Sequence, residues 1–155
     1  PQKRKTVLDI VEHACEERLY PVGRLDRNTT GVLLFTNDGD LSKKLCHPRN
    51  KIKKVYSVEL DKSLKTSDYE KIKSQIILKD GLVKVDEISY LKTKRNIGLE
   101  VHIGKNRIVK RIFEHLKYRV VKLDRTSFAG ITKKNLSRGK FRFLSQKEVN
   151  TLKRL

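Results

Sequence analysis

The segment of residues 23–40 constrains this chain most, because three kinds of local sequence follow one another within it. It opens with Gly-Arg-Leu-Asp-Arg, in which Asp26 lies between Arg24 and Arg27. Four apolar residues, Val-Leu-Leu-Phe, come soon after, and Thr-Asn-Asp-Gly follows them. This order predicts a loop, a buried strand over residues 31–36 and a turn. The flanking guanidinium groups favour an ionised Asp26, and an ionised carboxylate on a loop is a possible nucleophile.

The rest of the chain alternates between helical and strand periodicity, without an internal repeat or a low-complexity linker. Capping signals support three of the expected helices: Ser67 with Glu70, Asn106, and Ser145 with Glu148. The pattern predicts helices over 7–16, 41–45, 67–74, 107–117 and from 146 onward, and strands over 31–36, 53–60, 82–91, 97–103 and 119–123.

The charge of the chain is the most informative property of its composition. It has 37 Lys and Arg against 18 Asp and Glu, a formal net charge of +19. Such an excess favours a polyanionic partner, above all nucleic acid, over the alternatives of a membrane surface or plain solubility. No 18-residue apolar run and no signal-peptide core are present. We therefore expect a soluble, cytoplasmic protein.

The cysteines and histidines are too scattered for a metal site. Cys15 and Cys46 have no CxxC spacing and no histidine partner in a zinc pattern. The simplest interpretation is two reduced cysteines in the core. The sequence therefore predicts neither a metal ion nor a disulfide.

Five blocks in one order resemble a known family. They are the Gly23–Asp40 segment, His47-Pro48, Lys53–Val58, Asn106–Phe113, and a tail with Leu123, Arg125, Gly130, Leu136 and Gly139. Together they resemble the RsuA/RluB-type ribosomal RNA pseudouridine synthases from about residue 6 onward. The resemblance implies an α+β fold with a mixed, mainly antiparallel sheet and flanking helices, formed by one catalytic domain over 1–155. From the same resemblance, we expect the N-terminal RNA-binding domain and the first strand usual in this family to be missing from this chain.

The resemblance also implies a reaction and three catalytic residues. The reaction isomerises uridine to pseudouridine in ribosomal RNA, with large-subunit RNA favoured, and needs no cofactor because nothing is oxidised, added or lost. Asp26 would attack the sugar C1′ or remove the 2′ proton; the sequence does not choose between these routes. Tyr56 would pack on the target uracil, and Lys110 would pair with Asp26. On the residues alone, a core tyrosine and a solvated lysine remain the alternatives.

The remaining site predictions concern RNA contacts. The target base must leave the RNA helix, which costs roughly a few kcal/mol. Contacts between the protein and the RNA backbone offset this cost. Ile103 and Ile108 depart from the family pattern, which usually has Glu at the first position and a polar residue at the second. The family's local contacts to RNA or to the loop are therefore not assigned to these two residues. The residues assigned to RNA binding are Arg24, Arg27, Asn28, Thr29, Thr30, Lys54, Lys105, Asn106, Arg107 and Arg111.

Two other functions remain to be weighed. A non-catalytic RNA-binding or ribosome-assembly module could keep the same scaffold, but such a module has no need of Asp26, Tyr56 and Lys110 together. A metal-dependent nuclease is disfavoured because carboxylates and histidines do not cluster. We expect a monomeric enzyme that acts on ribosomal RNA, with no membrane partner.

Overall fold

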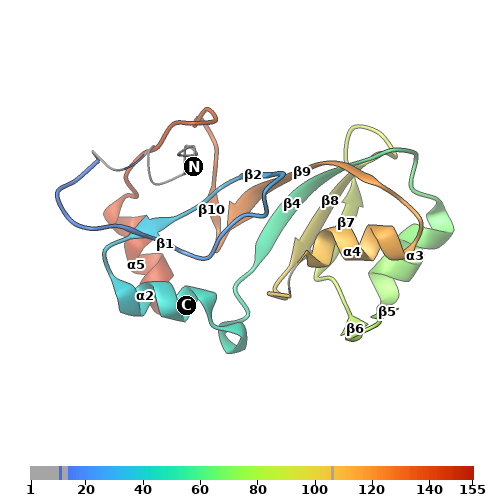
Figure 1. Cartoon of the computed structure of the whole chain (residues 1–155), viewed down its shortest axis with the longest axis horizontal. Coiled ribbons are helices and arrows are strands. Elements are labelled where there is room, and N and C mark those ends of the chain that lie inside the picture. Colours follow the sequence, from blue (N-terminus) through green and yellow to red (C-terminus); the bar gives the residue numbers. More distant parts are fainter. Residues whose placement is uncertain (1–10, 12–13, 106) are drawn as a thin grey trace, which may run out of the picture.

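The computed structural model describes residues 11, 14–105 and 107–155. Figure 1 shows a central sheet with helices grouped at its two ends. The four described α-helices are α2 (Gly39–Cys46), α3 (Thr66–Ser74), α4 (Ile108–His115) and α5 (Gln146–Arg154), and one 3-10 turn, η1, covers Pro48–Asn50. The strands are β1 (Tyr20–Pro21), β2 (Thr29–Gly31), β3 (Phe35–Thr36), β4 (Lys54–Leu60), β5 (Ile76–Leu78), β6 (Gly81–Val83), β7 (Glu87–Tyr90), β8 (Asn96–Val101), β9 (Val120–Phe128) and β10 (Ile131–Thr132).

The main sheet has six strands and is antiparallel except at one place. Its order is β10-β9-β4-β8-β7, and β2 adds to β9 in parallel. Two small antiparallel pairs, β1 with β3 and β5 with β6, lie outside it. The parallel pair joins segments more than ninety residues apart, since Thr29 pairs with Leu123 and Gly31 with Arg125. The predicted mixed, mainly antiparallel α+β fold is confirmed.

Gly31 is required where β2 meets β9. Its φ is +126°, which favours glycine, and a Cβ there would lie 2.2 Å from the carbonyl oxygen of Arg125. The backbone of β2 can therefore approach β9 only without a side chain at this position. The amide of Val32 still donates to the carbonyl of Arg125. Beyond Val32 the chain leaves the sheet, and the apolar run continues as an irregular segment.

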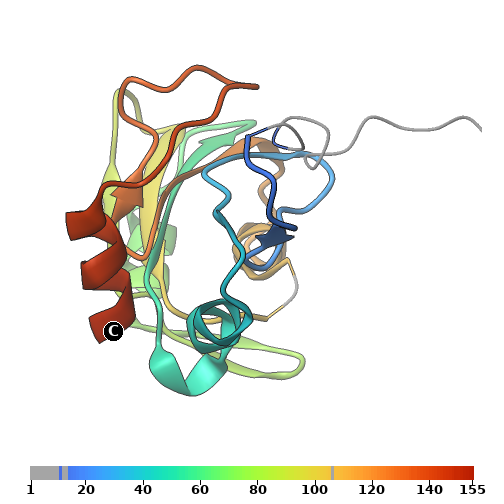
Figure 2. The ribbon, with the colours of Figure 1, turned by 90° about the vertical axis from the view of Figure 1, so that its left-hand side faces the viewer.

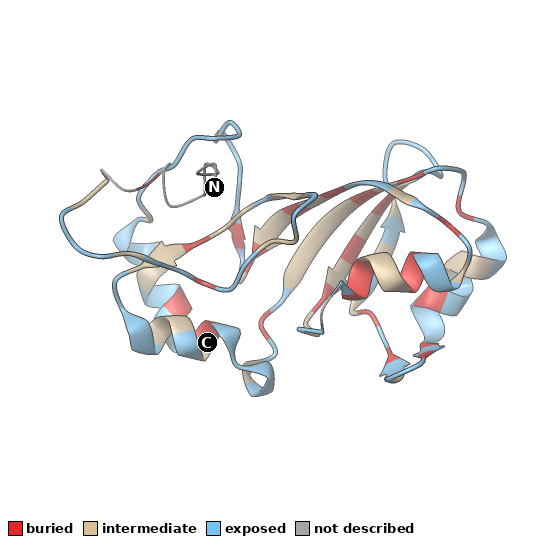
Figure 3. Cartoon of the chain, viewed as in Figure 1, coloured by how far each residue is buried: buried red, intermediate tan, exposed pale blue. Residues whose placement is uncertain are grey.

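The larger of two hydrophobic cores lies under α3 and α4. The apolar stripe of α4, residues Ile108, Val109, Ile112 and Phe113, lies next to β5 and β9 and shares one core with buried residues of β4 and β8. Phe113 is fully buried, and strand residues such as Leu99 alternate into the same interior. Figure 3 shows the buried positions of the sheet and of α4 facing each other.

The smaller core joins the N-terminal loops to the end of the chain. Leu45 of α2 and Leu152 of α5 pack with Val22, Leu34 and neighbouring apolar residues. Figure 2 shows α5 at one side of the sheet and the segment of residues 20–36 at the other. The start and the end of the 23–40 segment are thus anchored in the same small core.

Several predicted elements differ from the structure in extent. The single strand predicted over residues 31–36 is wrong. Val32 bonds to Arg125, and residues 32–34 form no strand between β2 and β3. The strand over 82–91 is split into β6 and β7, and the last strand continues to Phe128 rather than ending at Leu123. Helix α3 has Lys65 at its N-cap without a side-chain bond, so the Ser67 capping box is wrong. The helix over 7–16 lies mostly outside the described residues.

The remaining elements agree closely with the sequence patterns. Asp38 accepts a hydrogen bond from the amide of Leu41 and so caps α2. Ser145 and Glu148 form the predicted capping box of α5. These caps follow directly from local sequence, which is why the pattern located them.

Candidate functional site

The candidate site is a cavity of about 420 Å³ between the 23–29 loop, the sheet and α4. Its wall comes from both halves of the molecule, since the loop is anchored in the smaller core and α4 in the larger. Among the described residues of the wall, Asp26 is the one carboxylate. The cations of the wall are Arg24, Lys54, Lys105, Arg107, Lys110 and Arg125.

Asp26 is placed by the loop between β1 and β2. Gly23, at φ +69°, turns the chain into the loop, and the amide of Thr29 donates a 2.9 Å bond to the carbonyl of Asp26. That turn leads straight into the pairing of β2 with β9. The backbone on both sides of Asp26 is therefore fixed, while its side chain lies on the cavity wall.

Tyr56 reaches the cavity from the centre of the sheet. It lies opposite Leu99 of β8 on one side and opposite Arg125 of β9 on the other. The row of Tyr56, Val58 and Leu60 lines the larger core, with Val58 and Leu60 fully buried. Tyr56 ends this row at the point where the core opens into the cavity, so its ring can offer an apolar face to a planar ligand.

Arg125 is a site residue that the sequence analysis did not assign. It is the one buried charged side chain in the described part of the chain, at 3% exposure. It faces the same side of the sheet as Tyr56, because directly opposed residues of an antiparallel pair share a face. The signal in the sequence was an arginine two residues after Leu123 in an alternating strand, on the inward face.

Burial and the neighbouring charges alter the titration of this cluster. Burial raises the pKa of Tyr56, and the Arg125 guanidinium partly opposes that rise. Burial and the repulsion of Arg125 lower the pKa of Lys54 below its usual range. Asp26 contributes to the raised pKa of Tyr56, which indicates that the carboxylate and the phenol interact within the cavity.

Lys110 lies on the cavity wall, on the first turn of α4. Within the described residues no ion pair forms between its ammonium group and the carboxylate of Asp26. Their pairing therefore stays a prediction. Arg107, just before α4, has a left-handed backbone at φ +52° and pairs with Glu114 on the same helix.

The residues assigned to RNA binding divide into two groups. Arg24, Thr29, Lys54, Lys105 and Arg107 lie on the cavity wall. Arg27, Asn28, Thr30 and Arg111 do not, and Asn106 lies outside the described residues. Thr30 instead donates a 2.7 Å bond to Asp124, and Arg111 pairs with Asp80. These last two side chains hold β2 to β9 and α4 to the turn before β6.

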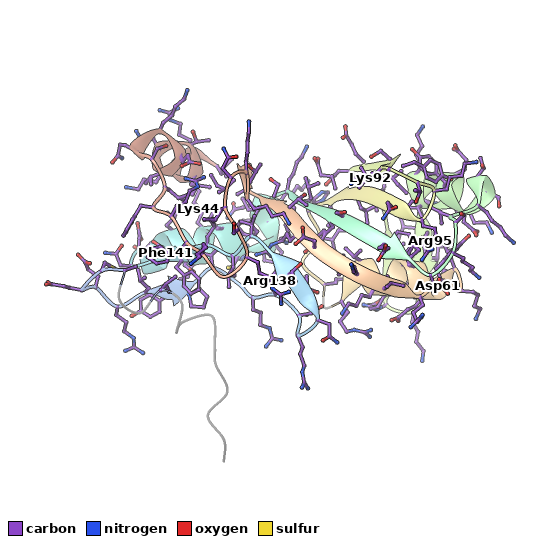
Figure 4. All side chains as sticks on the ribbon, turned by 90° about the horizontal axis from the view of Figure 1, so that it is seen from above. Lys44, Asp61, Lys92, Arg95, Arg138 and Phe141 are labelled. Atoms are coloured by element: carbon purple, nitrogen blue, oxygen red, sulfur yellow. The ribbon has the colours of Figure 1, made fainter. Side chains whose placement is uncertain are left out.

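The other cations cover the molecule rather than one face. Figure 4 shows lysine and arginine side chains around the whole outline, with Lys44 and Arg138 toward one end and Lys92 and Arg95 toward the other. An RNA larger than the cavity would therefore meet positive charge in several directions.

The thiols differ from the expectation of core residues. Cys46, the last residue of α2, is exposed on the cavity wall, and Cys15 is half-buried. Both are free. Over the described ranges, no three His, Cys, Asp or Glu side chains gather closely enough to hold a metal ion. None of the helices described is both long and apolar enough to span a membrane.

The comparisons with known proteins agree with this geometry. The sequence profile described as RNA pseudouridylate synthase matches residues 1–135. The chain belongs to the RNA pseudouridylate synthase family. It is 36% identical to the ribosomal large subunit pseudouridine synthase B of Bacillus subtilis, over 98% of this chain and 64% of that protein. It is 37% identical to an uncharacterized RNA pseudouridine synthase of Aquifex aeolicus, over 98% of this chain and 62% of the relative.

A solved structure of this family has the same fold. A crystal structure of a pseudouridylate synthase superposes with a TM-score of 0.84 at 27% identity, over 95% of this chain and 65% of that one. The chain thus spans less than two thirds of the length of these relatives. Membership in the pseudouridine synthase family, expected from the five sequence blocks, is confirmed.

Proposed function

We propose that this chain is the catalytic domain of an enzyme that isomerises uridine to pseudouridine in ribosomal RNA, with large-subunit RNA as the substrate class. The observation that carries the proposal is one carboxylate, Asp26, on a fixed loop at the wall of a cavity that also carries six cations and a half-buried tyrosine. The printed name of the Bacillus relative supports large-subunit RNA. We further propose that the enzyme acts as a monomer.

Asp26 would act on the ribose. Either its carboxylate bonds to C1′ while the C1′–N1 bond breaks, or it takes the 2′ proton to leave a glycal. The detached uracil then turns and bonds through C5 to the same carbon. Because the atoms are only rearranged, the reaction draws on no cofactor.

The surrounding residues would hold the extruded nucleotide. Tyr56 would offer a ring face to uracil, and Lys110, which shares the cavity wall with the Asp26 loop, would pair with Asp26. Arg24, Lys54, Lys105 and Arg107 supply positive charge for phosphates, which fixes the position of the RNA more than it selects a sequence. Because ribosomal RNA is the proposed substrate, we also propose a cytoplasmic location.

The test is tritium release from ribosomal RNA that carries 5-tritiated uridine. Active wild-type protein and a loss of about 10⁴-fold in Asp26→Asn support the proposal. Asp40→Asn is the matched control, since Asp40 is an exposed carboxylate on α2 outside the cavity wall. Equal activity of Asp26→Asn and wild type contradicts the role of Asp26. RNA binding without tritium release by any protein identifies a binding module instead.

A further inference from the structure

Arg125 is a buried cation without a carboxylate partner. None of the ion pairs in the described part of the chain includes it. A charge removed from water without a partner costs several kcal/mol, roughly, so such a residue needs compensation from elsewhere. An arginine keeps its proton in proteins, so this charge is permanent.

Part of the compensation comes from the backbone of the Asp26 segment. The Nε and Nη2 atoms of Arg125 donate to the carbonyl of Val32 at 2.9 and 2.6 Å. The amide of Val32 returns a 2.8 Å bond to the carbonyl of Arg125. The guanidinium carbon lies 4.7 Å from the centre of the Phe128 ring, which gives a cation–π contact. These contacts fix the plane of the guanidinium group.

The third nitrogen is left for the cavity. Within the described residues Nη1 of Arg125 bonds to no backbone carbonyl and no carboxylate. The guanidinium interacts with the phenol of Tyr56, and both side chains lie on the cavity wall with Asp26. The ladder places Arg125 directly opposite Tyr56, the residue proposed to pack on uracil. A donor fixed beside the base-binding ring is placed to meet an acceptor on the edge of that base.

The proposed reaction creates such an acceptor. In both routes the C1′–N1 bond breaks and its electron pair goes to the uracil ring. C1′ receives a replacement electron pair. In one route this pair comes from the Asp26 carboxylate, and in the other it comes from the C2′–H bond when Asp26 takes the 2′ proton. Uracil therefore leaves as an anion, with negative charge spread over N1 and the two carbonyl oxygens. That charge is consumed when C5 bonds to C1′.

We propose that Arg125 binds a carbonyl oxygen of the uracil ring and stabilises the uracil anion formed when the glycosidic bond breaks. The inference rests on the proposed function and assigns a base-binding and catalytic role to Arg125. A fixed cation in a site closed to bulk water stabilises developing charge more strongly than the same cation in water. The Val32 and Phe128 contacts supply this fixation before substrate binds.

The experiment compares Arg125→Gln and Arg125→Lys in single-turnover tritium release and in RNA binding. We expect Arg125→Gln to slow release by about 10²–10³-fold with RNA affinity changed by less than about threefold. Arg125→Lys, which keeps the charge, should recover part of the rate. Arg95→Gln is the matched control, because the Nε of Arg95 also donates to a backbone carbonyl, that of Leu60, but at the far end of the molecule from the cavity.

A change of leaving group separates catalysis from structure. The fluorine of 5-fluorouridine makes the ring anion more stable, so breakage of its glycosidic bond should depend less on Arg125. Nucleoside chromatography follows the loss of 5-fluorouridine itself, because C5 then carries no proton to release and the C5-linked product keeps its fluorine. A smaller ratio of wild-type to Arg125→Gln rates on 5-fluorouridine RNA supports the inference. The same ratio on both RNAs, wild-type rates in Arg125→Gln, or loss of the folded state in both Arg125 variants overturns it. Inactive wild-type protein would instead overturn the proposed function, and this inference with it.

Discussion

The two cores of this molecule differ in size and in the kind of chain that forms them. In the described residues the larger contains 17 buried side chains, carried by strands and helices of regular length. The smaller contains seven and is formed largely by loops, two-residue strands and the ends of helices. Local stability follows the density of buried apolar contacts. The half that carries Asp26 is therefore the less stable half.

The cavity lies where these two regions meet. The larger core holds Tyr56 and α4 with Lys110, whereas the smaller holds Val22 and Leu34 on either side of the Asp26 loop. Strand β9 belongs to both, since Leu123 packs in the larger core and Phe128 in the smaller. The comparison indicates that the position of Asp26 relative to Tyr56 depends on one shared strand.

The largest expected effect is in the larger core. Phe113→Ala removes a fully buried ring, and the cavity left behind should lower the free energy of unfolding by about 4 kcal/mol. Urea unfolding followed by circular dichroism measures this loss. A loss below about 1 kcal/mol would contradict the view that the larger core dominates stability.

The second prediction concerns the junction of β2 and β9. Gly31→Ala forces a side chain against the backbone of Arg125 and strains a positive φ, which should cost about 3 kcal/mol and misplace Asp26. Tritium release should then fall further than the loss of folded protein accounts for. Gly39→Ala is the matched control, because nothing lies within 4 Å of the added carbon there. If activity falls only in proportion to the amount of folded protein, the β2–β9 junction does not determine the position of Asp26.

The third prediction tests the smaller core. Leu152→Ala on α5 should cost about 2 kcal/mol, since this buried side chain packs among few neighbours that can hold an empty space open. Tryptic cleavage under native conditions should increase within residues 20–50 before the larger core opens. If cleavage instead increases equally in both halves, the two cores unfold as one unit.

The smallest effect is a pH dependence at α5. Both terminal nitrogens of Arg142 bond to Glu148 at 2.9 Å, and this guanidinium, with the amide of Ser145, lowers the pKa of Glu148 from 4.5 to about 2. Because the folded pKa is depressed, the stabilisation is present above the unfolded pKa and is lost as pH falls from about 4.5 toward about 2.

The urea midpoints of wild type and Glu148→Gln measure this contribution. They should differ near neutral pH, approach each other as the pH falls below about 4.5 and converge near pH 2, where Glu148 becomes protonated in the folded wild-type protein. A difference in urea midpoint that stays constant over this pH range would show that the stabilisation does not come from the charge of Glu148.

The same two regions differ in what the sequence could predict. In the larger core, β4 and α4 were located within one or two residues, because long apolar patterns have one clear period. In the smaller core, the run Val32–Phe35 predicted a strand, but Arg125 holds Val32 and turns the chain away. That contact joins residues 93 apart, so no local pattern contains it.

The site shows the same division between local and distant information. Asp26, Tyr56 and Lys110 were assigned through short motifs, and all three lie on one cavity wall. Arg125 belongs to the tail block of the resemblance, but no role was assigned to it, because its place in the site depends on the β9 register opposite Tyr56. Thr30 and Arg111 were assigned to RNA because they are polar and near the motifs, whereas their partners, Asp124 and Asp80, lie far along the chain.

The pairing of β2 with β9 has a consequence for the newly made protein. The Asp26 loop is made before most of the sheet, but the strand that receives it is completed only at residue 128. Contacts of such large sequence separation form late in folding. A chain synthesised only as far as β8 therefore carries Asp26 without the strand that holds its loop, and the cavity can form only after residue 128 has been made.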